Sequence, residues 1–236
     1  MTATPVALIG MGRMGRALAA LAPERGFQVV AALDAADPGY AGITSESLRG
    51  ASVAIEFTEP SAAPANVRAC LAARCPVVVG TTGWYEELPA ISADAERAGG
   101  ALLTAPNFSI GVAAFDRIVA EAGRLFARLE GFEAHLVETH HSAKRDAPSG
   151  TAAALAQTTE RTLGRRVPIT SVRVGHVPGT HEVVFDAPFE QIRLVHEARD
   201  RRVFAEGALV AARWLIGRRG VFTLADVLDA QPETIA

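Results

Sequence analysis

The sequence predicts an α/β protein in two parts: a parallel sheet with helices on both faces, and a smaller α+β domain with a mostly antiparallel or mixed sheet. In the first half of the chain, short apolar runs alternate with helical patterns, which is typical of parallel strands joined by helical crossovers. After Gly164, strand patterns follow one another with little helix between them, which favours antiparallel pairing. We place the first domain at residues 1–109, completed by residues 201–236, and the second at residues 110–200.

Hydrophobic periodicity gives the expected elements in order. Up to residue 129, strands are expected at 6–9, 27–33, 52–57, 77–79 and 101–104, and helices at 16–24, 61–73, 86–98 and 111–129. Strands follow at 134–140, 169–174, 181–185 and 191–196, with an alanine-rich helix that begins after Ser149 as its N-cap. Two last helices, 205–216 and 224–228, return the chain to the first domain.

The composition excludes several classes of partner. The 236 residues are 49% hydrophobic and 21% charged, with a net charge of −3, so nucleic acid and anionic membranes are not attracted in general. No apolar run approaches ~18 residues, and no signal peptide precedes the first strand. We expect a cytoplasmic protein with no nucleic-acid or membrane partner, in which Cys70 and Cys75 are buried thiols and not a disulfide.

A glycine-rich turn follows the first strand. Gly10, Gly12 and Gly15 have the spacing Gly-x-Gly-x-x-Gly between a strand and a helix, which gives a dinucleotide a tight turn, close backbone approach to its pyrophosphate, and close helix packing. The second strand ends in Asp34, where an acid accepts the adenosine ribose hydroxyls. The alternative is a turn whose glycines serve only packing. We predict a Rossmann-like domain that binds NADH, NADPH or both through Gly10, Met11, Gly12, Arg13, Met14, Gly15 and Asp34.

Small and hydroxylated residues follow the later strands of this domain. The third strand leads into Thr58, the fourth into residues 80–83, Gly-Thr-Thr-Gly, and the fifth into residues 105–109, Ala-Pro-Asn-Phe-Ser. Open α/β sheets bind ligands at the carboxyl ends of their strands. These ends therefore suit the nicotinamide half of a cofactor, which is expected to contact Gly80, Thr81, Thr82, Ala105, Pro106, Asn107 and Phe108.

The segment from Glu138 to Thr151 concentrates groups that donate protons and bind anions. His140, His141 and Lys144 lie where a strand runs out into a polar loop, and Ser149-Gly150-Thr151 opens a helix. Helix N-termini attract carboxylates, so a negative substrate could bind at Gly150 and Thr151. An ordinary helix cap would also explain the latter residues. A metal site formed by His135, Glu138, His140 and His141 is a second alternative, but the strand-like alternation opposes it, and we expect no metal.

In these motifs the chain resembles the 4-hydroxy-tetrahydrodipicolinate reductases, also called dihydrodipicolinate reductases. The resemblance extends from Gly10 to Leu228. It rests on Gly-Arg-Met-Gly at 12–15, Gly-Thr-Thr-Gly at 80–83, Pro-Asn-Phe-Ser at 106–109, and Glu-x-His-His-x-x-Lys-x-Asp-x-Pro-Ser-Gly-Thr-Ala at 138–152. Arg173-x-Gly175, Gly179-x-His181 and Phe204-Ala205-x-Gly207-Ala208 agree as well.

The resemblance implies a reaction and a role for each matched residue. The family reduces a cyclic imine dicarboxylate to tetrahydrodipicolinate with NADH or NADPH, in lysine and diaminopimelate biosynthesis, and forms homotetramers through the sheet of its second domain. His140 matches the family's proton donor and acceptor, and Lys144 its proton donor. His141, Gly150 and Thr151 match the groups that bind the substrate carboxylates.

Two departures from the family pattern stand out. Glu56 replaces the usual Asp, which keeps the charge. Asp34 is followed by Ala35 and Ala36 and not by the basic residue that some members use for the 2′-phosphate, so NADH is expected to serve at least as well as NADPH. Two other function classes remain open: a different two-domain nicotinamide dehydrogenase, and a non-catalytic sensor of NADH and a carboxylate.

Overall fold

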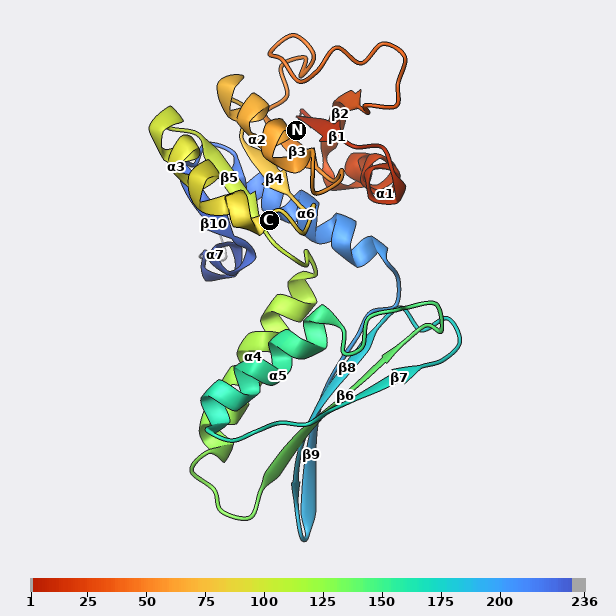
Figure 1. The fold of residues 1–236 in the computed structure, drawn as a ribbon, viewed down its shortest axis with the longest axis vertical. Helices are drawn as coiled ribbons and strands as arrows, with labels where there is room; N and C mark the ends of the chain where they lie inside the picture. The colour runs from red at the N-terminus through yellow and green to blue at the C-terminus, as the bar shows by residue number, and fades with distance from the viewer. Residues whose placement is uncertain (1, 231–236) are drawn as a thin grey trace. The chain divides into compact units, whose positions relative to one another are not determined.

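The computed structural model describes residues 2–230 and divides the chain into two units (Figure 1). The chain up to Ser109, together with the chain from Arg202 onward, forms the first unit, and Ile110–Arg201 forms the second. The part of the predicted first domain beyond residue 230 lies outside the described residues. No helix among the described residues is long and apolar enough to cross a bilayer.

The first unit is built on a six-stranded sheet in the order β10-β5-β4-β3-β1-β2, and every pair in it is parallel. Its strands are β1 (Thr4–Ile9), β2 (Phe27–Leu33), β3 (Val53–Glu56), β4 (Val77–Val79), β5 (Ala101–Thr104) and β10 (Gly220–Thr223). Strand order reverses at β1, which has β2 on one side and β3 on the other. Ligands of open α/β sheets bind at such a reversal.

Helices cover both faces of this sheet, as its apolar strands require. They are α1 (Arg13–Leu21), α2 (Ala63–Ala72), α3 (Leu88–Ala98), α6 (Arg202–Leu215) and α7 (Leu224–Asp229), with short 3₁₀ turns η1 (Ala22–Arg25) and η2 (Tyr85–Glu87). Alternate strand residues such as Ala7, Ala54 and Val77 pack with Val67 of α2 and Ile91 of α3 in one buried cluster. The predicted fold class is confirmed by this arrangement.

Two details of the first unit differ from the sequence prediction. The helix expected from Arg16 begins at Arg13, because Gly12 takes the N-cap position and the next turn residues are already helical. The short strand β10 was not predicted. It pairs with β5 at the edge of the sheet, from Gly220 opposite Ala101.

The second unit packs two helices on one face of a mixed sheet (Figure 1). The sheet order is β7-β6-β8-β9, with β6 parallel to β7 and antiparallel to β8. Its elements are α4 (Ile110–Phe126), β6 (Glu133–His140), α5 (Gly150–Leu163), β7 (Ile169–Arg173), β8 (Thr180–Ala187) and β9 (Glu190–Glu197). Phe126 of α4 stacks on Phe185 of β8 with ring centroids 4.3 Å apart. Leu136 and Leu155 lie in the same core.

Candidate active site

The three glycines of the turn after β1 have three different surroundings. Gly10 has φ +89°, and a Cβ there would overlap the carbonyl oxygen of Phe57. A Cβ at Gly15 would overlap the carbonyl oxygen of Gly10, so α1 packs directly on the turn. Gly12 has no atom within 4 Å of its Cβ position. This turn therefore combines tight packing at its two ends with open space at its centre, which leaves room for a ligand to approach the backbone.

Asp34 lies beside this turn at the end of β2. Its carboxylate accepts hydrogen bonds from the backbone N–H of Ala36 at 2.9 Å and of Met11 at 2.7 Å. These two bonds lower the pKa of Asp34, because they favour the charged carboxylate. The structure thus brings Asp34 and the glycine turn together, as the sequence predicted. The Asp34 side chain is held there in its charged form.

The ends of β3, β4 and β5 are tied to one another. The hydroxyl of Thr81 accepts a hydrogen bond from the Thr58 N–H at 2.7 Å, and the rings of Phe57 and Phe108 meet edge to face with centroids 5.9 Å apart. Gly80 has no room for a side chain, because a Cβ would overlap the Phe57 ring. Gly80, Thr81 and Phe108, which are predicted to contact nicotinamide, therefore lie close to the loop after β3, at the carboxyl ends of the strands.

Glu56 is the last residue of β3 and is fully buried. One of its carboxylate oxygens accepts hydrogen bonds from the Thr58 hydroxyl and, at 3.3 Å, from the Asn66 amide. The acid that stands where the family usually has Asp thus supports the loop after β3. Its role here is to hold the position of Thr58.

A polar row crosses the helix-covered face of the second sheet. Ser171 of β7 is in register with Glu138 of β6, Glu138 with His181 of β8, and His181 with His196 of β9. Glu138 is fully buried and His181 is 5% exposed. Two residues before Glu138 on the same face of β6, Leu136 belongs to the apolar core. Buried polar groups need hydrogen-bond partners, and the contacts of this row show which groups supply them.

Glu138 is the centre of the network. Its Oε1 accepts a hydrogen bond from the Arg173 guanidinium at 2.6 Å and from the Ser149 N–H at 3.3 Å, and its Oε2 pairs with Nδ1 of His140. Burial alone would raise the pKa of Glu138, but hydrogen bonds from Arg173, Ser171 and His140 bring that pKa down to about 2. Glu138 is therefore an ionised, buried carboxylate at neutral pH.

His140 is the last residue of β6 and is 7% exposed. Burial lowers the pKa of His140 below its ordinary value, and the Glu138 carboxylate opposes this, since it favours the charged ring. The positive charges of Lys144 and Arg173 act with burial. On the other side of the ring, a Cβ at Gly179 would lie 3.0 Å from Nε2. A side chain at Gly179 would therefore press on that nitrogen.

The loop after β6 carries Lys144. Its Nζ lies 2.8 Å from Oδ1 of Asp146, and its backbone N–H donates to the carbonyl of His141 at 3.0 Å. Arg173 donates to the backbone carbonyl of Asp146 at 2.6 Å. The same guanidinium therefore contacts both Glu138 and the Lys144 loop. Neither Arg173 nor Asp146 was predicted to be a site residue.

The start of α5 lies directly behind this loop. Ser149 is the N-cap, as predicted, and its Oγ accepts a hydrogen bond from the Ala152 N–H at 3.2 Å. The same Oγ lies 3.3 Å from Nε2 of His181. Gly150 is exposed and Thr151 half-buried, so the first turn of the helix can be reached by a ligand. The structure thus brings the start of α5, His140 and the Lys144 loop close together within the second unit.

The donor groups of Glu138, His140 and His181 lie within 4.8 Å of one another. This set differs from the predicted alternative, because His135 points to the opposite face of β6. Arg173 already holds the Glu138 carboxylate, and a cation at the cluster would be repelled by that guanidinium. We read the cluster as a hydrogen-bonded network.

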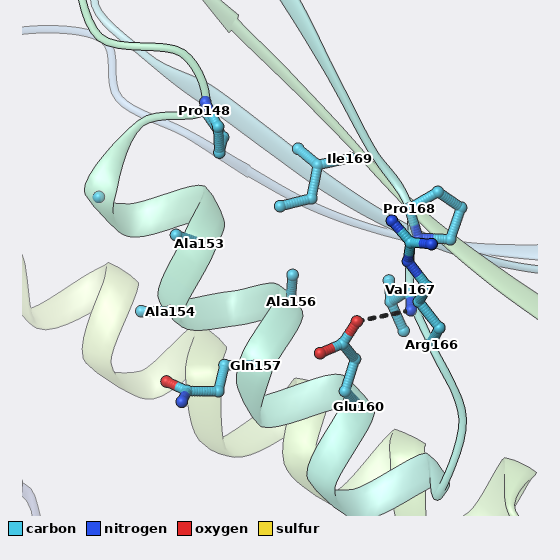
Figure 2. Close-up of a pocket in the computed structure, with 11 residues that line it drawn as sticks. Pro148, Ala153, Ala154, Ala156, Gln157, Glu160, Arg166, Val167, Pro168 and Ile169 are labelled. Carbon is cyan, nitrogen blue, oxygen red and sulfur yellow. Dashed lines mark hydrogen bonds between the residues drawn. The ribbon is translucent and has the colours of Figure 1, made fainter.

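A groove of about 780 Å³ runs along α5 beside the chain that enters β7 (Figure 2). Gly150 is one of its lining residues, but His140 and Lys144 are not. Within it, the Glu160 carboxylate accepts a hydrogen bond from the Val167 N–H at 2.9 Å (Figure 2). This contact holds the α5–β7 connection, and we assign the groove to packing of that connection.

The first unit defines the class of the protein. Parallel strands that reverse order beside a glycine turn and a fixed carboxylate form the architecture of the dinucleotide-binding Rossmann proteins. A probable dehydrogenase from Thermotoga maritima shares the fold with a TM-score of 0.63, at 9% identity, over 94% of this chain and 92% of that chain.

Both units match one family within this class. The model described as dihydrodipicolinate reductase, N-terminus, matches residues 4–108, and the model of its C-terminus matches residues 111–228. The chain belongs to the dihydrodipicolinate reductase family, which confirms the resemblance found in the sequence.

Individual relatives agree with this assignment. The 4-hydroxy-tetrahydrodipicolinate reductase of Thiobacillus denitrificans is 37% identical over 94% of this chain and 97% of its own. That of Christiangramia forsetii is 34% identical over 95% and 97%. A dipicolinate-bound dihydrodipicolinate reductase from Paenisporosarcina sp. TG-14 shares the fold with a TM-score of 0.83, at 23% identity, over 95% of this chain and 99% of that chain.

Proposed function

We propose that this chain reduces 4-hydroxy-tetrahydrodipicolinate to tetrahydrodipicolinate, with loss of water, using hydride from NADH or NADPH, in lysine and diaminopimelate biosynthesis. Family membership over both units supports the reaction. The observation that carries the site is the convergence of His140, the Lys144 loop and the start of α5 at the end of β6. One segment thereby offers groups for proton transfer beside a helix start that favours a carboxylate.

The nucleotide is assigned to the first unit. Gly10 to Gly15 would hold its pyrophosphate, with the open space at Gly12 as the point of close approach. Asp34, held as an anion, would accept the ribose hydroxyls. The nicotinamide end would lie against Gly80, Thr81 and Thr82 and against residues 105–108. When bound, the cofactor supplies the hydride.

The substrate is assigned to the second unit. Gly150 and Thr151 would bind one carboxylate through the start of α5, together with His141. Hydride transfer to the conjugated ring leaves electron density that a proton must quench. Lys144 would deliver that proton, and His140 would orient or replenish it. The Lys144 ammonium donates a hydrogen bond to the Asp146 carboxylate at 2.8 Å.

Lys144→Ala tests this assignment. We expect kcat to fall roughly 10²- to 10³-fold while the Kd for NADH changes little. Arg145→Ala is the matched control, because it removes an adjacent exposed cation. The assay follows NADH consumption with substrate made in situ by the preceding synthase. Unchanged turnover in Lys144→Ala would remove this residue from the mechanism.

The same assay separates the alternative functions. A wild-type protein that binds NADH but does not consume it with this substrate would be a sensor or a different dehydrogenase. Consumption that depends on the synthase reaction supports the reductase.

We further propose a homotetramer in the cytoplasm. Val172 and Val195, on the outer face of the second sheet, are 37% and 54% exposed, and another copy of that sheet would cover them. Free, buried Cys70 and Cys75 suit a reducing compartment. Light scattering coupled to size exclusion should give the tetramer mass, and Val195→Lys should lower it. A monomeric wild type would rule out the assembly.

A further inference from the structure

We propose that Glu138 is a positioning residue, which fixes the ring of His140 with its proton on Nδ1 and joins that ring to the Lys144 loop through Arg173. The inference deepens the proposed function and rests on it. Glu138 itself is fully buried and would not touch substrate. Its effect is exerted through the groups that its two oxygens hold.

The Glu138 carboxylate sets the position of the His140 proton. Both oxygens of Glu138 are engaged by donors, from Arg173 and Ser149 on Oε1 and from His140 on Oε2. An ionised carboxylate can only accept hydrogen bonds. Nδ1 of His140 must therefore carry a proton in both the neutral and the charged ring.

The other ring nitrogen of His140, Nε2, is left to exchange protons. With Nδ1 always protonated, proton exchange at His140 is confined to Nε2. Nε2 is the atom that faces Gly179, where no side chain intervenes. Glu138 thus selects the nitrogen through which His140 can pass a proton. An aspartate behind a catalytic histidine selects a tautomer in the same way in the Ser-His-Asp triad.

A chain of polar contacts joins His140 to Lys144. Arg173 bridges the Glu138 carboxylate and the backbone carbonyl of Asp146, and the Asp146 side chain holds the Lys144 ammonium. The two groups assigned to proton transfer are therefore attached to opposite ends of one ion-paired network. Moving Glu138 would displace both.

The charged and titratable groups around His140 set the expected change in its titration. Glu138 faces it from its own strand, Lys144 from the following loop, Arg173 from β7 and His181 from β8. Among these, Glu138 alone favours the charged ring. Its neutralisation should therefore move the His140 titration to lower pH.

The experiment compares wild type with Glu138→Gln by NMR of protein labelled with ¹⁵N in its histidine rings. His140 is assigned by the resonances lost in His140→Gln. We expect the Nδ1-protonated form in wild type, and in Glu138→Gln the loss of that preference with a titration shifted to lower pH. The kcat should fall roughly 10²-fold, and its pH profile should shift in the same direction, with little change in NADH binding. Glu133→Gln, which neutralises an exposed carboxylate on the same strand, is the control.

Two results would overturn the inference. A wild-type His140 with its neutral proton on Nε2 contradicts it without any variant, so the test holds even if Glu138→Gln does not fold. An unchanged tautomer and titration in a folded Glu138→Gln would also contradict it. The ring measurements require no turnover. A wild type that lacked reductase activity would therefore refute the proposed function while the role of Glu138 is judged separately.

Discussion

Acidification is expected to destabilise the second unit through His181. This side chain is 5% exposed. Burial, and after it the charges of His140 and His196, lower the pKa of His181 to about 4 from 6.5. Between these values the unfolded chain binds a proton that the folded chain does not bind. The contribution of the neutral His181 ring to the free energy of unfolding is therefore fully present above pH 6.5 and is lost as the pH falls towards 4.

The Ser149 hydroxyl contacts the same ring. Its Oγ lies 3.3 Å from Nε2 of His181, and a hydroxyl can donate to a neutral ring or accept from a protonated one. This contact between β8 and the N-cap of α5 is therefore compatible with both forms of the ring, and the destabilisation by acid comes from burying a charge.

The size of the effect follows from the two pKa values. They differ by about 2.5 pH units, and each unit is equivalent to about 1.36 kcal/mol, so the loss reaches about 3 kcal/mol near pH 4. Domains are stable by only ~5–15 kcal/mol. A change of this size is well within the range of a denaturation experiment.

His181→Gln removes the titrating ring and keeps an oxygen that can accept from Ser149. Hydrogen exchange of β8 peptides, corrected for intrinsic rates and followed from pH 7 to pH 4, measures the opening free energy of this unit. The variant should be the less stable protein at pH 7, and its deficit should shrink or reverse by pH 4. His135→Gln, on the opposite face of the sheet, should retain the wild-type dependence. Parallel pH curves for wild type and His181→Gln would refute the reasoning.

Four further predictions address single features. Gly10→Ala forces a methyl group against the Phe57 carbonyl at φ +89° and should lower the free energy of unfolding by at least about 1–2 kcal/mol. Gly12→Ala meets no atom, so it should leave unfolding nearly unchanged and raise the Kd for NADH by at least about tenfold, or 1.4 kcal/mol. The anionic Asp34 should make kcat/KM for NADH at least equal to that for NADPH, in steady-state assays. Ser149→Ala should cost about 1 kcal/mol in urea unfolding.

The Gly10 and Asp34 predictions have specific contrary outcomes, and the Ser149 prediction has a matched control. A Gly10→Ala protein as stable as wild type would show that the turn can relax. A preference for NADPH above about tenfold, or roughly 1.4 kcal/mol, would contradict the Asp34 argument. Ser149→Thr retains a capping hydroxyl, so it should lose less stability than Ser149→Ala.

Much of the fold could be predicted because periodicity and turn chemistry are local. The strand at Phe27–Leu33 was predicted with its observed bounds, and the Ser149 cap was identified from its own neighbours. β10 was not predicted, because a strand of four residues at the edge of the sheet is too short to show a clear periodic pattern. Its pairing with β5 depends on tertiary contacts that no local rule contains.

The candidate site was predicted unevenly for the same reason. His140 and Lys144 belong to one short motif, so the sequence displays them together. Arg173 is 35 residues from Glu138, and His181 meets Glu138 only through the register of β6 and β8. A histidine on a buried strand was the available signal, but it could not be given a partner without that register.

Both units end a strand in a loop that leads straight into the start of a helix. After β1 this helix is α1, and after β6 it is α5. A negatively charged ligand at either place would be held largely by main-chain N–H groups, which side-chain replacement cannot delete. Affinity for anions would then survive much surface variation, and a chain of net charge −3 could handle two acidic molecules without a cluster of arginines.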